Sequence, residues 1–323
     1  MNKALDLIVY YLQNVRKLFV TGSARKVLQI LMVILLWAIC YPLITTGLTA
    51  FSPFHFAALR SFLAGLSLIV VAYILKRSLL PEKAIWPVLV LVSLTFTGLG
   101  FTGMFLAGGR VSPGLATVIA NIQPLLAALL GYFLLTERLT KIKGLALFIG
   151  FMGIVIISFT GLIEFSINST PYGIGLVLLG ATGVAIGNVL LKIIADRVDP
   201  LIAMAWVLLL GAIPLAMAAA VFEDVNEINW SPGSIIDLLI LSIPGTALAF
   251  FWWLELLRET DLNELNAYTF LTPVFALLIG LLFYSERLLM FEWLGVSVIV
   301  FAIFLACLPE KSMLSSREKT DQV

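Results

Sequence analysis

The chain is divided into apolar runs about 20 residues long, separated by short charged connections. A helix needs about 20 mostly apolar residues to cross the ~30 Å hydrocarbon core of a bilayer. The apolar residues Ala, Val, Ile, Leu, Met, Phe, Trp, Tyr and Cys make up 61% of the 323 residues, and charged residues make up only 12%. A soluble protein usually has about 25% charged residues. Because no water-soluble fold could bury so much apolar surface, the sequence predicts an all-α membrane protein that crosses the bilayer many times.

Ten runs are expected to be transmembrane helices, bounded by charge clusters, Pro and Gly. They cover approximately residues 28–48, 54–75, 84–107, 113–134, 142–160, 172–191, 200–221, 235–257, 264–284 and 290–308. The connections between them are too short to hold an extramembrane domain. This argues against a receptor or sensor, which would need a signalling domain.

The two ends of the sequence differ from the rest. Residues 1–27 have apolar residues at roughly helical spacing followed by basic residues. This favours a helix lying on the cytoplasmic leaflet over a secretory signal, whose charge would precede its apolar core. A disordered tail is the alternative for this segment. Residues 309–323 are polar and are expected to form a disordered cytoplasmic tail.

Basic residues are distributed unequally between the two sides of the predicted membrane. With the N-terminus in the cytoplasm, 17 of the 20 Lys and Arg residues fall on the cytoplasmic side. The outer side has only Arg110 and Arg287, and Arg60 lies within a span. By the positive-inside rule, both termini are expected in the cytoplasm of a multi-pass protein of the cell (cytoplasmic) membrane.

A motif is repeated within the chain at one constant offset. The segment from Gln123 to Arg138 resembles the segment from Thr272 to Arg287, with six identities in sixteen positions. The residues that recur 149 positions apart include Pro124 and Pro273, Gly131 and Gly280, Glu137 and Glu286, and Arg138 and Arg287. Each copy ends the fourth apolar run of its half. Since five is odd, the second half enters the membrane from the opposite side, and two inverted five-helix repeats are predicted, 28–160 and 172–308. Inverted repeats are typical of transporters.

The sequence resembles the drug/metabolite transporter superfamily, in particular its EamA family of ten-helix carriers. The resemblance covers about residues 28–308 and rests on the two Pro-x6-Gly-x5-Glu-Arg segments, Trp37 and the Ala58-Leu-Arg60 stretch. It implies a secondary transporter, or permease, working by alternating access without ATP. The implied substrate is a small organic metabolite, such as an amino acid or related compound, and efflux is the expected direction. The alternative is a lipid-acting membrane enzyme or a sensor without transport activity, but no acidic metal motif or nucleophile beside a base supports an enzyme.

Polar and aromatic side chains within the spans are the candidates for substrate binding, since a polar group in hydrocarbon is costly unless it faces the bundle interior. The candidates are Trp37, Tyr41, Arg60, Asn121, Gln123, Asn188, Trp252, Asn266 and Thr269. For the amides and Thr269, the competing interpretation is that they satisfy backbone groups freed where Pro124 and Pro273 kink their helices. For Arg60 it is that the side chain bonds helix-end carbonyls and extends outward to water.

The remaining polar groups are assigned to structure. Pro124 and Pro273 are expected to act as hinges, and Glu137, Arg138, Glu286 and Arg287 to fix the geometry of helix ends. Glu255 could carry a coupling proton, but an i,i+3 pair with Arg258 is the preferred interpretation. A single histidine, His55, excludes a histidine-based metal site, and neither catalytic residues nor a cofactor are expected. The expected partners are a small-molecule substrate and the lipid bilayer, with a homodimer left open and no nucleic acid at a net charge of +1.

Overall fold

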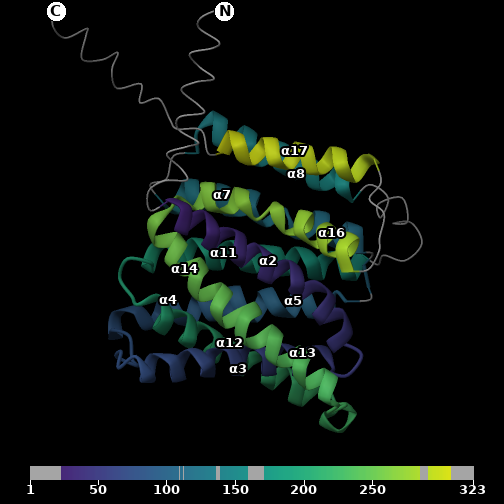
Figure 1. The fold of residues 1–323 in the computed structure, drawn as a ribbon. Coiled ribbons are helices and arrows are strands. Elements are labelled where there is room, and N and C mark those ends of the chain that lie inside the picture. Colours follow the sequence, from purple (N-terminus) through teal and green to yellow (C-terminus); the bar gives the residue numbers. More distant parts are fainter. Residues whose placement is uncertain are drawn as a thin grey trace, which may run out of the picture.

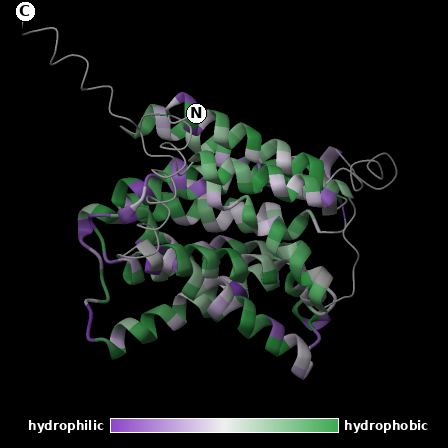
Figure 2. Ribbon diagram, turned by 45° about the horizontal axis from the view of Figure 1, so that its top comes forward, coloured by the Kyte–Doolittle hydropathy of each residue, from purple (hydrophilic) through white to green (hydrophobic). Residues whose placement is uncertain are grey.

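The protein is described by a computed structural model covering residues 23–108, 110–111, 113–135, 139–158, 171–283 and 290–306. Within these ranges the regular elements are helices, and no strand is present. The helices lie side by side with their axes roughly along one direction (Figure 1). Apolar residues cover most of their length, and polar residues gather toward the ends of the bundle (Figure 2). This is the arrangement expected of a helix bundle embedded in a membrane.

The helical elements are best followed in chain order. They are α2 (Ser23–Gly47), α3 (Pro53–Ile74), η1 (Lys83–Ile85), α4 (Trp86–Val92), η2 (Ser93–Leu99), α5 (Gly100–Leu106), α6 (Pro113–Ala120), α7 (Gln123–Leu134), α8 (Lys141–Ile157), α11 (Pro171–Ile194), α12 (Pro200–Phe222), η3 (Val225–Glu227), α13 (Pro232–Ser242), η4 (Ile243–Leu248), α14 (Ala249–Glu259), α15 (Leu262–Tyr268), α16 (Leu271–Phe283) and α17 (Met290–Ala306).

In the described part of the chain, eight helical segments are long and apolar enough to cross a membrane. They are Arg25–Ile44, Pro53–Ile74, Lys83–Leu106, Ala116–Leu134, Pro171–Ile194, Pro200–Phe222, Pro232–Glu259 and Leu262–Ile279. Helices α8 and α17 have 17 residues each and overlap the predicted spans 142–160 and 290–308. A multi-pass membrane fold is therefore confirmed, while the count of ten spans stays a prediction.

Two spans expected to be single helices are each built from two. Helix α6 ends at Ala120 and α7 begins at Gln123, so Pro124 lies in the first turn of a new helix. In the same way α15 ends at Tyr268 and α16 begins at Leu271, close before Pro273. Proline has no N–H to donate and fits the first turn of a helix without loss. Each of these two spans is therefore interrupted just before its proline, which is where the sequence predicts a kink.

Two other spans contain a π-helical stretch in their middle. Element η2 joins α4 to α5, and η4 joins α13 to α14. A π-helix widens the helical turn to an i→i+5 pattern and is found frequently at functional sites. The apolar runs 84–107 and 235–257 gave no sign of this widening, because it changes no residue's hydropathy.

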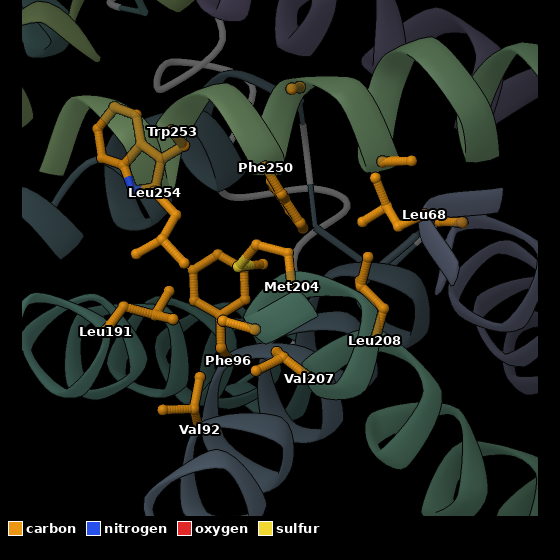
Figure 3. Packing of buried hydrophobic residues seen from close by; sticks show 14 of the residues in the cluster. Leu68, Val92, Phe96, Leu191, Met204, Val207, Leu208, Phe250, Trp253 and Leu254 are labelled. Atoms are coloured by element: carbon orange, nitrogen blue, oxygen red, sulfur yellow. The ribbon is translucent and has the colours of Figure 1, made fainter. Parts of the chain in front are cut away.

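The most extensive helix pairs lie at opposite edges of the bundle: α3 with α12, and α8 with α17 (Figure 1). Helix α11 lies between them and contacts α5, η2, α7 and α6. Its close approach to α5 depends on glycine, since a Cβ on Gly103 would lie 2.4 Å from the carbonyl oxygen of Leu176. Small residues allow such approaches in membrane helices. The main apolar core fills the space among α4, η2, α11, α12 and α14, as Figure 3 shows.

The two ends of the bundle are closed by different contacts. At the first, called here the lysine end, Lys26, Lys143 and Lys192 surround the turn between α14 and α15. At the other, called the Glu223 end, the Glu223 carboxylate accepts hydrogen bonds from the backbone N–H groups of Phe54 and His55 at 2.7 and 2.8 Å. Glu223 thereby caps the start of α3 from the end of α12, and His55 Nδ1 lies 2.9 Å from the same carboxylate.

Candidate functional site

An aromatic cluster lies at the centre of the bundle, where α2, η2, α11 and α14 meet. The ring of Trp37 lies 4.9 Å from Trp253 and 5.9 Å from Phe250, centroid to centroid. Phe250 in turn meets Phe96 at 5.0 Å. Figure 3 shows Phe250 and Trp253 projecting from one helix toward Phe96 and the core residues below it.

One polar pair is buried inside this cluster. The indole N–H of Trp253 donates to Oδ1 of Asn188 at 2.8 Å, and the two residues are 1% and 2% exposed. This bond offsets the cost of burying the amide of Asn188. Asn188 and Trp252 were both predicted as site residues, and the residue that bonds to Asn188 is Trp253. Trp252 is only partly buried and packs against the outside of the same core.

Several predicted site residues have buried polar atoms without hydrogen bonds. Asn266 is 0% exposed, yet neither its Oδ1 nor its Nδ2 has a hydrogen-bond partner among the described residues. The same holds for Nε1 of Trp37 and Nε2 of Gln123. Leaving a buried amide unpaired costs about 1–3 kcal/mol, so each such group calls for an explanation, such as a water or a ligand. Helices α7 and α15, which carry Gln123 and Asn266, pack against each other.

Arg60 is also buried, at 2% exposure, which is incompatible with the alternative that its side chain extends outward to water. Its Nε donates to Oγ1 of Thr246 in η4 at 2.7 Å, and its Nη2 lies 3.7 Å from the thiol sulfur of Cys40. No described residue offers a hydrogen-bond partner to Nη1. The guanidinium carbon lies 4.8 Å from the ring centroid of Phe101 and 5.8 Å from that of Phe105.

Two other predicted site residues form hydrogen bonds to backbone groups a few residues earlier in the chain. Nδ2 of Asn121 donates to the carbonyl of Thr117 at 2.8 Å, and Oγ1 of Thr269 donates to the carbonyl of Asn266 at 2.7 Å. Both bonds lie where one short helix ends and the next begins. For these two residues the geometry matches the structural interpretation, in which the side chain satisfies backbone groups at a helix break.

The lysine end is closed by bonds from three helices. Lys192 of α11 donates to the carbonyls of Leu257 and Thr260 at 2.6 and 2.8 Å. Lys143 of α8 pairs with Asp261 at 2.7 Å. Lysines near a helix C-terminus satisfy its last carbonyls and complement its dipole.

The expected pair of Glu255 with Arg258 is not the one that forms. Arg258 lies 4.0 Å from Asp196, and Glu255 accepts a long bond of 3.5 Å from Gln29. The carboxylate of Glu255 thus bonds to a residue of another helix, Gln29 of α2, and not to Arg258 in the next turn of α14.

The remaining candidates fall on parts of the chain that are not described. The backbone of Tyr41 lies in α2, and its side chain is outside the described part of the structure. Glu137, Arg138, Glu286 and Arg287 lie outside the described residues. Within the described ranges, no three His, Cys, Asp or Glu side chains gather closely enough to hold a metal ion.

The contacts of Thr246 and Phe250 were missed by sequence reasoning, although a signal was present. Ser93, Thr97, Leu99 and Phe101 recur 149 positions later as Ser242, Thr246, Leu248 and Phe250. This is the offset of the Pro-x6-Gly-x5-Glu-Arg repeat, and the recurring residues fall within the two π-helical stretches or no more than two residues outside them. The aromatic and hydroxyl residues of both stretches could therefore have been proposed as equivalent positions.

Comparisons with known proteins cover most of the chain. Residues 24–159 and residues 171–308 each match the EamA-like transporter family. A chloroplastic WAT1-related protein of Arabidopsis thaliana is 31% identical over 266 residues, a match that spans 80% of this chain and 63% of that protein. An uncharacterized transporter of Synechocystis is 29% identical over 92% of this chain and 94% of its own length. A solved crystal structure superposes with a TM-score of 0.76 over 92% of this chain and 99% of its own, at 21% sequence identity, which supports the same fold.

Proposed function

Because this chain belongs to the EamA-like transporter family, and similar proteins are named as transporters, we propose that it is a secondary carrier of a small organic metabolite. An amino acid or a related compound is the proposed class of substrate. The carrier works by alternating access of two inverted five-helix halves in the cytoplasmic membrane, without ATP, in the direction of efflux.

Two observations support the two-halves mechanism. The same family matches the chain twice, over 24–159 and over 171–308. In addition, the π-helical stretches η2 and η4 lie one in each matched region and share residues at the offset of the sequence repeat. Two similar halves can exchange outward-facing and inward-facing shapes about a site at the midplane.

The charge at the two ends supports the proposed orientation. Lys26, Lys143 and Lys192 lie at the lysine end, and Glu223 caps a helix at the opposite end. By the positive-inside rule the lysine end faces the cytoplasm, and both termini lie on that side. Its contacts then form the inner closure, which must open for a cytoplasmic solute to reach the centre.

The observation that carries the site assignment is the buried amide of Asn266, both of whose polar atoms lack partners. Trp37 and Gln123 add further unpaired donors, and Asn188 adds a buried amide beside Trp253. A substrate bound among these side chains would supply the missing hydrogen bonds. Asn188 and Asn266 are buried, as are the unpaired nitrogens of Trp37 and Gln123. In the proposed mechanism the substrate therefore reaches them only when the bundle opens.

Transport by purified protein in liposomes tests the function. Liposomes without ATP are loaded with labelled amino acids, nucleobases, sugars or cationic compounds, and exchange across the membrane is measured. At least one class is expected to exchange faster than in empty liposomes. If no solute of the panel moves, the carrier function is wrong.

Substitution of the amides tests the site. Asn266→Ala and Asn188→Ala are expected to slow exchange by about tenfold or more, because each removes a hydrogen bond worth about 1.4 kcal/mol or more. Asn226→Ala is the matched control, since Asn226 lies in the exposed turn η3. If the folded Asn266→Ala protein exchanges solute at the wild-type rate, the central site lies elsewhere.

A further inference from the structure

The geometry around Arg60 points to the charge of the substrate, and we infer that its guanidinium binds a carboxylate group of an organic anion. The inference rests on the proposed carrier function and adds the chemical class of the cargo to it. Three features carry it: the missing counter-charge, the unpaired nitrogen and the position of Arg60 beside the central aromatic cluster.

A buried guanidinium needs a negative partner. Arg60 is 2% exposed, and the buried polar side chains of the described part of the chain include neither Asp nor Glu. Its neighbours are a hydroxyl from Thr246 and a thiol from Cys40, both neutral. An uncompensated buried charge is strongly destabilising, and a protein that retains one without a carboxylate of its own is suited to receive an anion from outside.

The neighbours of the Arg60 guanidinium leave its Nη1 edge without a hydrogen bond. The rings of Phe101 and Phe105 lie near its carbon, and such cation–π contacts partly offset the loss of water. Nε is taken by Thr246, while Nη1 has no bonding partner in the ranges that the structure covers. Arginine presents its N–H groups as a planar fork that matches a carboxylate.

Arg60 is joined to the central cluster by shared neighbours. Cys40, which contacts Arg60, follows Trp37 on α2 by three residues, or about 4.5 Å along the helix axis. Phe250 contacts both Trp37 and Phe101, and Phe101 contacts Arg60. A molecule with a carboxylate at Arg60 would therefore place its apolar body against Phe250 and its far end near Trp37 and Asn188.

The η4 stretch supplies the hydroxyl that orients Arg60. Oγ1 of Thr246 donates to the carbonyl of Leu241, five residues earlier, and accepts from Arg60. The widened turn thus fixes the direction of the hydroxyl, which fixes the guanidinium. Thr246 is a positioning residue in this site, and Arg60 is the residue that touches the anion.

Matched pairs of acids and amides test the inference. The probes are benzoate, phenylacetate and N-acetylphenylalanine, each with its neutral primary amide, and benzylamine as a cation. Their binding is measured by the rise in unfolding temperature of the purified full-length chain. At least one acid is expected to bind about thirtyfold more tightly than its amide, as for a charge-assisted pair in a buried site. If no acid raises the unfolding temperature more than its amide, the inference is overturned.

Variants of Arg60 give the second arm of the test. Arg60→Gln is expected to bind acid and amide equally, and Arg60→Lys to retain part of the preference. Arg110→Gln is the matched control, because Arg110 is exposed and is expected to leave the preference unchanged. If Arg60→Gln does not fold, Thr246→Val replaces it and is expected to weaken acids several-fold without affecting amides.

The outcomes separate this inference from the carrier function. If folded Arg60→Gln or Thr246→Val retains the full acid preference, the anion site is wrong. Exchange of only neutral or cationic solutes in liposomes also overturns it, while the carrier function stands. Binding of acids without ATP-independent exchange of any solute has the opposite meaning, since it supports the site and contradicts the carrier.

Discussion

The two π-helical stretches share a backbone form and a sequence pattern, but their threonines meet different surroundings. Thr246 of η4 lies between the carbonyl of Leu241 and the guanidinium of Arg60. Thr97 of η2 lies at the matching position, yet its Oγ1 is buried without a hydrogen-bond partner in the described part of the chain. It faces Gly211 of α12, where a Cβ would lie only 2.4 Å from the Cβ of Thr97.

The difference shows that two similar halves can place different side chains, one charged and one without charge, at equivalent contacts. Each π-helical stretch packs against the second helix of the other matched region, η4 against α3 and η2 against α12. In the first contact α3 supplies a charged side chain, and in the second α12 supplies a glycine that makes room for Thr97. In the proposed mechanism, the shared geometry would serve the movement of the halves and the charge of Arg60 would serve recognition of the substrate.

The largest effect on stability is expected from removing the charge at the contact of η4 with α3, so that this contact resembles the uncharged contact of η2 with α12. Arg60→Met should raise the free energy of unfolding by about 1–4 kcal/mol, because an apolar side chain of similar length replaces a buried charge and Thr246 keeps its bond to Leu241. The same variant should lose transport. The free energy is measured by SDS titration and transport by liposome exchange. A less stable Arg60→Met protein would show that the charge is already compensated inside the protein.

A smaller effect should distinguish the two threonines directly. Thr246→Val is expected to lower the free energy of unfolding by about 1.5–3 kcal/mol, since it breaks a bond to a charged group. Thr97→Val should be neutral within about 0.5 kcal/mol or stabilising, because it removes an unpaired hydroxyl. Thermal unfolding of both proteins in one detergent measures the difference. Equal losses would mean that Thr97 has a partner after all.

The contact of η2 with α12 can be broken from the glycine side. Gly211→Ala is expected to cost about 1–3 kcal/mol of stability through overpacking. Adding Thr97→Gly should restore part of the loss, since it removes the atom that the new Cβ meets. Gly175→Ala is the control, as a Cβ there meets nothing within 4 Å. A double variant no more stable than Gly211→Ala alone would contradict this packing argument.

The smallest effect is expected at the lysine end. Lys143→Met removes the ion pair with Asp261, in which the side chains of Lys143 and Asp261 are 13% and 55% exposed. Because one partner is in contact with solvent, the pair is expected to contribute about 1 kcal/mol or less. The unfolding temperature should therefore change little, while the rate of solute exchange changes if the pair helps to close this end. An unchanged exchange rate would assign the pair to the scaffold alone.

Much of the fold could be predicted from hydropathy, because crossing a membrane demands about 20 apolar residues wherever it occurs. The interruptions before Pro124 and Pro273 could also be predicted, because proline has no N–H to donate. The π-helical stretches η2 and η4 could not, because they change no residue's hydropathy.

The site was predictable in part for a related reason. Asn188, Asn266, Gln123 and Trp37 were found because polar atoms within spans are costly and therefore conspicuous. Trp253 is buried and Trp252 is only partly buried. The sequence could not show this difference, because both neighbours of each tryptophan are apolar and the pattern does not reveal which face of α14 points inward. The partner of Arg60 lies 186 residues away, and only the packing of α3 against η4 brings it near.

Arg60 is the one charged residue among the buried residues of the described part of the chain, and for the proposed carrier this has an electrical consequence. When an anion binds, its charge and that of Arg60 cancel, so the loaded carrier is neutral in the membrane and the empty one is positive. A voltage that is negative inside favours the inward return of the empty carrier, and each cycle exports one negative charge. This voltage supplies about 2.3 kcal/mol per elementary charge for every 100 mV, equivalent to about a fiftyfold concentration ratio. Such a carrier can expel its cargo against a gradient without a coupling ion.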